Sequence, residues 1–449
     1  MAAVSPARAA AFQILMAVER GKAHSDELLR GKNVSALSEA DRHLATALVL
    51  GSLRWQIWLD AQIDPLLKRP NAKLDPEARV PLRMGAYQLL KMDRIPAHAA
   101  IDESVALTKQ AGHQFAARMV NAVLRKLSGG APRPEPSDEP LAGDAATEAY
   151  PRWMVERWVR FYGEDAAQTI CRHGQSQPIT AIRVIDSGAE AELVTADIEL
   201  TPGSLLEGAR IVTSGDVTAI AAFREGRVRL QDEGSQLVAE IAGRGDAILD
   251  CCAAPGGKTL ILAERNPTTH LVACEVSAER LAQLQERLAL LDERVEFRHG
   301  DAGALRDSDA FDVVLADVPC SGTGTLGRNP EIRHRLREED LARQAERQEA
   351  ILRAAIRAVR PGGRVVYSTC SLEPEENEQV VAKLLAGAPD AQVIPMQERI
   401  AELASEGILK PESAESLRNC VTSEGYLRLL PGKFQTDGFF IAMLGKRSH

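Results

Sequence analysis

Apolar residues recur every three or four positions from residue 5 to residue 127, the spacing of one face of an α-helix. The alternation typical of strands is absent from this stretch. Ser38, followed by Glu39 and Asp41, suits a helix N-cap, because its hydroxyl can accept from backbone N–H groups left free in the first turn. The clearest helical runs are residues 8–15, 37–51, 82–90 and 115–125. The front of the chain is therefore expected to be an all-helical bundle.

The pattern changes after residue 130. Turn-forming residues and repeated prolines predict a linker. A helix around Trp153–Phe161 and strand-like runs at 181–185 and 209–212 then predict a small α/β module. Beyond it, short apolar strands alternate with long helices, as in a parallel, doubly wound sheet. The expected segments are a bundle at 1–130, a Pro-rich linker at 131–147, the module at 148–226 and an α/β domain at 227–449.

Acidic residues close several predicted strands of the α/β domain. Asp317 follows Val313–Ala316, an apolar run that predicts a strand buried on both faces. Asp250, Glu275 and Asp301 stand at the ends of three earlier strands. Each acid alone would be interpreted as a solvated turn residue. Because the carboxyl ends of parallel strands share one edge of a sheet, where ligands of such sheets bind, the four together predict a binding site.

The loop after residue 250 favours a nucleoside cofactor. Gly256 and Gly257 precede a helix, so the backbone can approach a ligand closely and free N–H groups face it. Gly257-Lys258-Thr259 resembles the end of a phosphate-binding loop, but that motif needs glycine where Cys252 stands. The dinucleotide glycine pattern is also missing. Glu275 is placed to accept hydrogen bonds from both hydroxyls of a ribose. A plain strand-to-helix turn is the alternative.

Two thiols stand at the ends of two strands. Pro319 cannot donate to a sheet ladder, so Cys320 is expected in a loop after Asp317. Cys370 follows the strand 364–368 in the same way. A free cysteine is more often core filler than catalyst. Two cysteines at one edge of a sheet favour a catalytic role. The acidic run Glu373–Glu378 that follows Cys370 predicts the start of a helix, because acids are favoured in a first turn.

Charge and cysteine content narrow the class of protein. Residues 1–130 contain 18 Lys and Arg against 12 Asp and Glu, whereas the remainder contains 36 against 51. A net positive charge in residues 1–130, beside a net negative charge in the remainder, suits a negatively charged partner that contacts mainly residues 1–130. Chance variation in charge between domains would give the same pattern. The seven cysteines are scattered without C-x-x-C pairs, which favours reduced thiols and no zinc site. With 45% hydrophobic residues, no apolar run of 18 and no signal peptide, the protein is expected to be cytoplasmic.

Several motifs in the α/β domain resemble those of the Sun-type RNA cytosine-5 methyltransferases, which use S-adenosylmethionine. The matching runs are Cys252-Ala253-Ala254-Pro255-Gly256-Gly257-Lys258, Asp317-Val318-Pro319-Cys320, Asn329-Pro330-Glu331-Ile332-Arg333 and Ser368-Thr369-Cys370-Ser371, flanked by Gln231–Ser235 and Asp437–Phe440. Val318 and Glu275 are mild departures, since family members often carry alanine and aspartate there. The resemblance implies a Rossmann-like class I methyltransferase domain.

The front of the chain resembles a NusB-like RNA-binding bundle. The runs that carry this likeness are Arg83–Leu89, Pro96–Glu103 and Val120–Arg125. The module at 148–226 resembles the RRM-like insert of the same enzymes. The expected fold is thus multidomain: an all-α NusB-like bundle, a small RRM-like α/β module and the methyltransferase domain. This combination is typical of the type B bacterial methyltransferases of 16S ribosomal RNA.

The resemblance also implies roles for individual residues. Cys370 would be the nucleophile, Cys320 would allow product release, and Asp317 would hold the nitrogen-3 edge of the cytosine. The implied cofactor-binding residues are Cys252, Ala253, Ala254, Pro255, Gly256, Gly257, Lys258, Glu275, Asp301 and Asp317. The loop would hold the methionine, Glu275 the ribose and Asp301 the adenine, and Lys258 would help polarise the site.

The expected partner is unassembled or partly assembled 16S ribosomal RNA, bound by a monomer without metal or membrane. Three alternatives stay open at this point. A DNA cytosine-5 methyltransferase would use Cys320 as its nucleophile, and a related enzyme would act on another RNA such as tRNA. A ribosome-assembly factor would bind RNA without catalysis.

Overall fold

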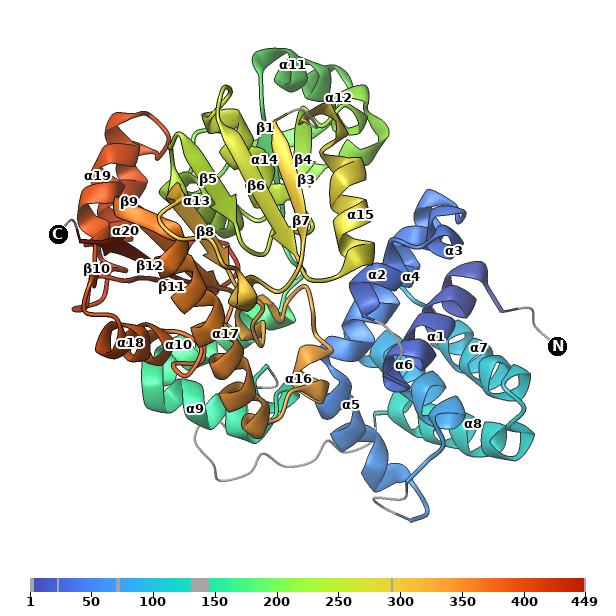
Figure 1. Cartoon of the computed structure of the whole chain (residues 1–449). Coiled ribbons are helices and arrows are strands. Elements are labelled where there is room, and N and C mark those ends of the chain that lie inside the picture. Colours follow the sequence, from blue (N-terminus) through green and yellow to red (C-terminus); the bar gives the residue numbers. More distant parts are fainter. Residues whose placement is uncertain are drawn as a thin grey trace. The chain divides into compact units, whose positions relative to one another are not determined.

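The computed structural model describes residues 4–21, 24–69, 73–130, 144, 146–291 and 294–447 (Figure 1). The chain forms two compact units. The first comprises Met1–Gln177 with Leu326–Arg335, and the second comprises Pro178–Thr325 with Leu336–His449. Of the linker predicted at 131–147, residues 131–143 and 145 lie outside the described residues.

The first unit is entirely helical in the part described, as the apolar spacing predicts. Ser38 caps α4, its hydroxyl accepting from the backbone N–H of Asp41 at 3.2 Å. Helix α6 packs against α1, α4, α5, α7 and α8, and buries Leu82, Met84 and Ala86 completely. The helices are α1 (Pro6–Glu19), α2 (Ser25–Leu29), α3 (Lys32–Ser35), α4 (Glu39–Arg54), α5 (Gln56–Ile63), α6 (Pro76–Lys91), α7 (Ala97–Gln110), α8 (Gln114–Ser128), α9 (Arg152–Tyr162), α10 (Glu164–Gln175) and α16 (Ile332–Arg335).

The segment Leu326–Arg335, which includes α16, is anchored within the first unit by buried charges. Arg333 is 1% exposed, and its guanidinium donates to the carbonyls of Arg54, Ala149, Gly174 and Leu326 at 3.0–3.3 Å. The buried carboxylate of Glu331 accepts from the backbone N–H and the hydroxyl of Ser25 at 3.0 and 2.8 Å. The motif Asn329–Arg333 therefore contributes to the helical unit.

The range 148–226 is divided between the two units. Its helices α9 and α10 belong to the first unit, while residues from Pro178 onward belong to the second. There they form an antiparallel sheet in the order β2-β3-β1-β4, in which β1 and β3 contain most of the two predicted strand runs. The elements are β1 (Thr180–Val184), α11 (Ser187–Thr195), β2 (Glu199–Pro202), β3 (Ala209–Ser214), α12 (Ala221–Arg224) and β4 (Val228–Leu230).

The second unit also contains a large sheet in the order β10-β12-β9-β8-β5-β6-β7 (Figure 1). Strands β5 to β9 pair in parallel, as predicted. The sheet as a whole is mixed, because β11 and β12 form an antiparallel pair and β12 runs antiparallel to β9. The strands are β5 (Ala247–Asp250), β6 (His270–Glu275), β7 (Val295–His299), β8 (Phe311–Asp317), β9 (Val359–Thr369), β10 (Ala391–Val393), β11 (Leu427–Leu429) and β12 (Phe439–Lys446).

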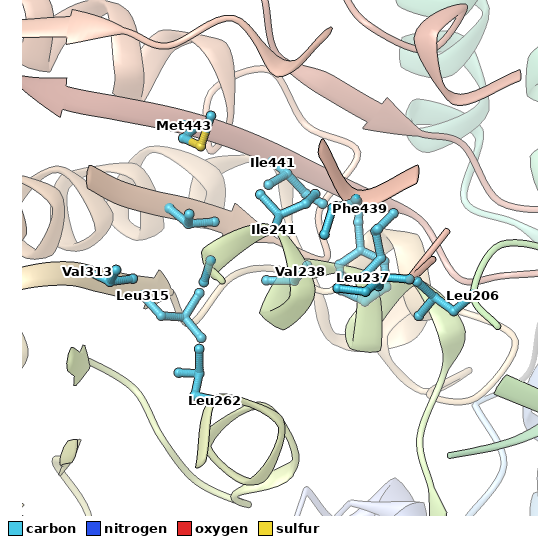
Figure 2. Packing of buried hydrophobic residues seen from close by; sticks show 14 of the residues in the cluster. Leu206, Leu237, Val238, Ile241, Leu262, Val313, Leu315, Phe439, Ile441 and Met443 are labelled. Carbon is cyan, nitrogen blue, oxygen red and sulfur yellow. The ribbon is translucent and has the colours of Figure 1, made fainter. Parts of the chain in front are cut away.

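Helices cover both faces of this sheet, which explains why the central strands β5, β6 and β8 are mainly apolar and buried. Val313 and Leu315 of β8 lie in the same layer as Val238 and Ile241 of α13, as Figure 2 shows. Val314, between them in sequence, belongs to the opposite layer with residues of α17 and α18. The helices of this region are α13 (Glu233–Ala242), α14 (Gly257–Arg265), α15 (Ala278–Arg287), α17 (Glu338–Ala358), α18 (Glu378–Gly387), α19 (Met396–Ser405) and α20 (Pro411–Arg418).

Residues 401–424 complete the core on the α13 side. Leu403 and Leu417 are fully buried in the same cluster as α13. The backbone N–H of Lys410 donates to the carbonyl of Leu205 at 2.9 Å, and Ser413 Oγ donates to the carbonyl of Ser204 at 2.6 Å. This segment therefore ties the sheet of β1–β4 to the large sheet.

Candidate active site

The loop between β5 and α14 forms a tight turn that exposes the beginning of the helix. Gly256 has φ of +98°, in the left-handed region that favours glycine, and a Cβ there would lie 2.7 Å from a methyl carbon of Leu284. Thr259 Oγ1 donates to Asp250 at 2.8 Å, which fixes the helix to the end of β5. Burial raises the pKa of Asp250 to about 6. The backbone N–H groups at the start of α14 are thus available to a ligand.

Most of the predicted site residues line two neighbouring cavities. The larger, of about 370 Å³, is lined by Cys252, Ala254, Glu275, Asp301, Asp317, Cys320 and Cys370. The smaller, of about 120 Å³, is lined by Ala253, Pro255, Gly257 and Lys258, and shares Cys252, Ala254 and Asp317 with the larger. Gly256 lines neither cavity and shapes the turn. The structure therefore brings residues from five strand ends into one region.

The acids at the ends of β6 and β7 have the chemistry that an adenosine group requires. Glu275 is 3% exposed, and its Oε1 accepts from the backbone N–H of Ser277 at 2.9 Å. Asp301 is exposed and accepts from the backbone N–H of Gly303 at 2.9 Å. Each carboxylate has two oxygens with several acceptor positions, so capacity remains for ribose hydroxyls and an adenine amino group. The donor and acceptor set fits S-adenosylmethionine.

Asp317 lies between two donors. Lys258 Nζ is 2.8 Å from Asp317 Oδ2, and Ser368 Oγ donates to Oδ1 at 2.7 Å. Burial alone would lower the pKa of Lys258, but the negative charge of Asp317 outweighs it and the pKa is raised. A charged lysine therefore stands beside the acid Asp317.

The two thiols meet because β8 and β9 are adjacent and parallel. Cys320 Sγ and Cys370 Sγ are 3.4 Å apart. The hydrogen bond with Cys370, together with burial, raises the pKa of Cys320 well above its ordinary value. At neutral pH Cys320 is thus a thiol that can donate to the Cys370 sulfur. By contrast, Cys171, Cys251 and Cys274 are buried thiols outside this pair.

Sequence reasoning missed Glu376. The run from Glu373 predicts a helix that begins there, but this prediction is wrong, because α18 begins at Glu378. Glu376 is instead turned inward and is completely buried, with donors from Ser321, Ser371 and Gln348 around its carboxylate. One signal in the sequence could have indicated this contact: each loop carries a serine directly after its cysteine, in Cys320-Ser321 and in Cys370-Ser371.

Two arginines and one serine were also missed. Arg280 and Arg347 line the larger cavity, and Arg280 donates to the carbonyl of Ala254 at 2.9 Å. Ser368 was assigned to a strand without a role, yet it holds Asp317. Their side chains come from helices and a strand face, where sequence spacing does not distinguish them from ordinary surface or core positions.

The described residues contain neither a cluster of metal ligands nor a membrane-spanning helix. No group of three or more His, Cys, Asp or Glu side chains in that part of the chain is arranged to hold a metal ion. Among the same residues, no helix is long and apolar enough to cross a bilayer.

Comparison with known proteins finds relatives along the whole chain. The model of the 16S rRNA methyltransferase RsmB/F family matches residues 242–445, and that of the NusB family matches residues 5–128. The probable ribosomal RNA small subunit methyltransferase B of Bacillus subtilis is 33% identical over 452 residues, covering 97% of this chain and 98% of that one. The ribosomal RNA small subunit methyltransferase B of Pseudomonas putida is 32% identical over 460 residues, covering 98% of each.

Two solved structures share the fold. The crystal structure of PH0851 has a TM-score of 0.79 at 24% identity and covers 99% of this chain and 100% of that one. The structure of NSun6 from Pyrococcus horikoshii with SFG has a TM-score of 0.55 at 20% identity, covering 67% of this chain and 99% of that one.

Proposed function

The chain belongs to the 16S rRNA methyltransferase RsmB/F family, and from that premise we propose that it methylates carbon-5 of a cytosine in small-subunit ribosomal RNA through a covalent cysteine adduct. The resemblance drawn from the sequence motifs is confirmed for the family and the fold. The chain is an S-adenosylmethionine-dependent RNA methyltransferase, so neither a DNA methyltransferase nor a non-catalytic assembly factor describes it.

S-adenosylmethionine supplies an activated methyl group when bound. In our proposal the loop Cys252–Lys258 holds its methionine part near the start of α14, Glu275 accepts from the ribose and Asp301 accepts from the adenine. Support comes from the two neighbouring cavities at this edge of the sheet. Glu275 and Asp301 line the larger cavity, most of the loop lines the smaller one, and Asp317 lines both. Buried Glu275 is well placed for this, since few waters compete for its oxygens.

Cys370 is the proposed nucleophile. Carbon-5 of cytosine is a poor nucleophile, and addition of the Cys370 thiolate to carbon-6 converts the ring into an enamine whose carbon-5 can attack the methyl group. A bond forms between sulfur and carbon-6, and nitrogen-3 takes up a proton. Carbon-5 then takes the methyl group as the bond between that methyl group and the sulfonium sulfur breaks, and carbon-5 loses its proton to solvent. Finally the sulfur–carbon-6 bond breaks, nitrogen-3 gives up its proton, and the double bond between carbon-5 and carbon-6 is restored.

Asp317 is the proposed anchor for the cytosine. Its carboxylate can accept from the ring's amino group and from the proton on nitrogen-3 of the adduct. The contacts with Lys258 and Ser368 fix the orientation of this carboxylate before the base arrives, which reduces the cost of ordering it later.

Cys320 is proposed to assist release. Its thiol lies 3.4 Å from the Cys370 sulfur and can donate a hydrogen bond to that sulfur as the carbon–sulfur bond breaks. The raised pKa of Cys320 keeps this proton in place at neutral pH. Release would therefore stall without Cys320, while attack by Cys370 would continue.

The helical unit is the proposed RNA-binding part. Phe115 of α8 is 97% exposed, and Arg118 and Arg125 lie three and ten residues further along the same exposed face. Arginines pair with phosphates, and an exposed aromatic ring can stack on an unpaired base. A target cytosine must leave its stack to reach the thiols, so the proposed substrate is an unpaired stretch of RNA. We further propose that this RNA is unassembled or partly assembled and that the reaction takes place in the cytoplasm.

The observation that carries this proposal is the pair of thiols, 3.4 Å apart at the ends of two adjacent strands, next to Asp317 and its partner Lys258. Incubation with ribosomal RNA and S-adenosylmethionine, followed by a denaturing gel, tests it. Cys370→Ala should abolish both methylation and any covalent complex, whereas Cys320→Ala should accumulate a covalent complex. Cys420→Ala, a buried cysteine outside both cavities, is the matched control and should behave as the unaltered protein. A covalent complex that persists in Cys370→Ala would refute the assignment.

The substrate needs a separate test. Bisulfite sequencing of RNA from a deletion strain, with and without the gene restored, should show one small-subunit ribosomal cytosine that loses and regains its methyl group. Loss of a methyl group from a tRNA cytosine instead would show that tRNA, and not ribosomal RNA, is the substrate.

A further inference from the structure

Glu376 is a buried carboxylate that the proposed chemistry does not use. It is 0% exposed, and within the described part of the chain it makes no ion pair with lysine, arginine or histidine. A buried charge of this kind is costly unless several donors surround it. The donors present are therefore informative about what Glu376 does.

These donors come from both thiol loops and from one helix. Ser321, the residue after Cys320, donates its backbone N–H to Glu376 at 2.8 Å and its hydroxyl to the other carboxylate oxygen. Ser371, the residue after Cys370, donates its hydroxyl to the same carboxylate. Gln348 of α17 donates to Glu376 and to the carbonyl of Pro319, both at 2.9 Å. Glu376 thus joins the loop that carries Cys320 to the loop that carries Cys370.

The two loops depend on Glu376 to different degrees. Ser371 has further attachments, because its carbonyl accepts from Asn377 at 2.9 Å and its hydroxyl accepts from the backbone N–H of Glu373 at 3.0 Å. The backbone carbonyl of Cys370 also accepts from Gly324 at 2.8 Å. Ser321 has fewer attachments: its N–H donates to Glu376, and its hydroxyl contacts Glu376 and, at 3.0 Å, the Ser371 hydroxyl that the same carboxylate holds. Loss of the carboxylate would therefore release Cys320 more than Cys370.

We propose that Glu376 is a positioning residue for Cys320, which holds the Cys320 sulfur against the Cys370 sulfur so that the covalent adduct can be released. This inference rests on the proposed function, since it assigns Glu376 to the release half of that reaction. The negative charge of Glu376 acts in the same sense, because it helps to raise the pKa of Cys320 after the larger effects of Cys370 and burial. The carboxylate thus keeps Cys320 both placed and protonated.

The test compares Glu376→Ala with Glu376→Gln. The amide oxygen of glutamine can still accept from Ser321 and Gln348, and its NH₂ can donate to the serine hydroxyls once these rotate. A misplacement of about 1 Å at a reacting group can cost about 100-fold in rate. We therefore expect Glu376→Ala to lower turnover by about that factor while a covalent RNA complex accumulates, and Glu376→Gln to restore most of the turnover.

A merely structural role would give a different result. Glu376→Ala would then lose turnover and the covalent complex together, and this outcome would overturn the inference. S-adenosylmethionine binding by calorimetry shows whether the variant is folded. Where Glu376→Ala does not fold, Ser321→Ala removes one hydroxyl that donates to Glu376 and should also accumulate the covalent complex. Absence of the complex in Ser321→Ala would equally refute the inference. Cys320→Ala in parallel separates the two hypotheses, because absence of a complex there would refute the proposed function itself.

Discussion

Replacement of Arg333 by methionine should destabilise the helical unit strongly, although position 333 lies far along the chain from most of that unit. Methionine retains an unbranched apolar stem of similar length, so the change removes the guanidinium without leaving a large cavity. The carbonyls of Arg54, Ala149, Gly174 and Leu326 would lose their charged donor. The guanidinium carbon also lies 4.0 Å from the centre of the Tyr150 ring, and that contact would be lost.

The magnitude follows from two opposing effects. A hydrogen bond to a charged group contributes about 1.5–3 kcal/mol, and four are lost. Burial of the guanidinium opposes this gain, as the lowered pKa of Arg333 indicates. Removal of one partner from a buried charged network typically costs about 3–5 kcal/mol. For a unit of this size, that corresponds to a fall in Tm of about 6–20 °C.

Thermal unfolding followed by circular dichroism measures this change. Arg30→Ala is the matched control, since Arg30 is 76% exposed and its pair with Asp26 should contribute less than about 1 kcal/mol. Arg333→Lys should fall between the two, because one ammonium cannot reach four carbonyls. A Tm for Arg333→Met equal to that of the control would refute the view that this segment is anchored by its buried charge.

Three further predictions concern pH, the cofactor and RNA. Burial lowers the pKa of His334 to about 3, whereas the unfolded chain has the ordinary value of 6.5, so between these values the unfolded state binds the extra proton. The free energy of unfolding should therefore fall by about 2 kcal/mol from pH 7 to pH 5, and His334→Gln should flatten this dependence in denaturant titrations; an unchanged slope would contradict the assignment. Glu275→Ala should weaken S-adenosylmethionine binding by about 10- to 100-fold in calorimetry, while exposed Glu279→Ala should not; equal affinities would exclude Glu275 from the ribose site. Phe115→Ala should weaken binding of unpaired RNA by about 1–3 kcal/mol in fluorescence anisotropy, with little effect on S-adenosylmethionine binding; unchanged RNA affinity would remove α8 from the interface.

The helical front and the location of the site could be predicted because both depend on local regularities. Helical spacing needs only neighbouring residues. The shared edge of Asp317, Cys320 and Cys370 follows from the rule that parallel strands end on the same side, whatever their order. The acids Glu275 and Asp301 follow from the same rule, and the structure places them along the same cavity.

The helix start at Glu373 was mispredicted because a run of acids in a first turn is also what a helix N-terminus shows. The buried state of Glu376 depends on Ser321, 55 residues away in sequence, and on Gln348, 28 residues away. The antiparallel direction of β12 likewise depends on its pairing with β11 and β9. None of these partners can be inferred from the residues around Glu376 or β12.

The sequence by itself determined which residues stand at the ligand-binding edge, because an apolar run followed by an acid or a thiol specifies a strand and its end. Only the tertiary structure decided which ends are neighbours. Adjacent β8 and β9 bring Cys320 and Cys370 to 3.4 Å, and Lys258 from α14 reaches Asp317 at 2.8 Å. Strand order arises from long-range packing of whole layers, and a buried charge is stabilised by whichever distant donors that packing supplies.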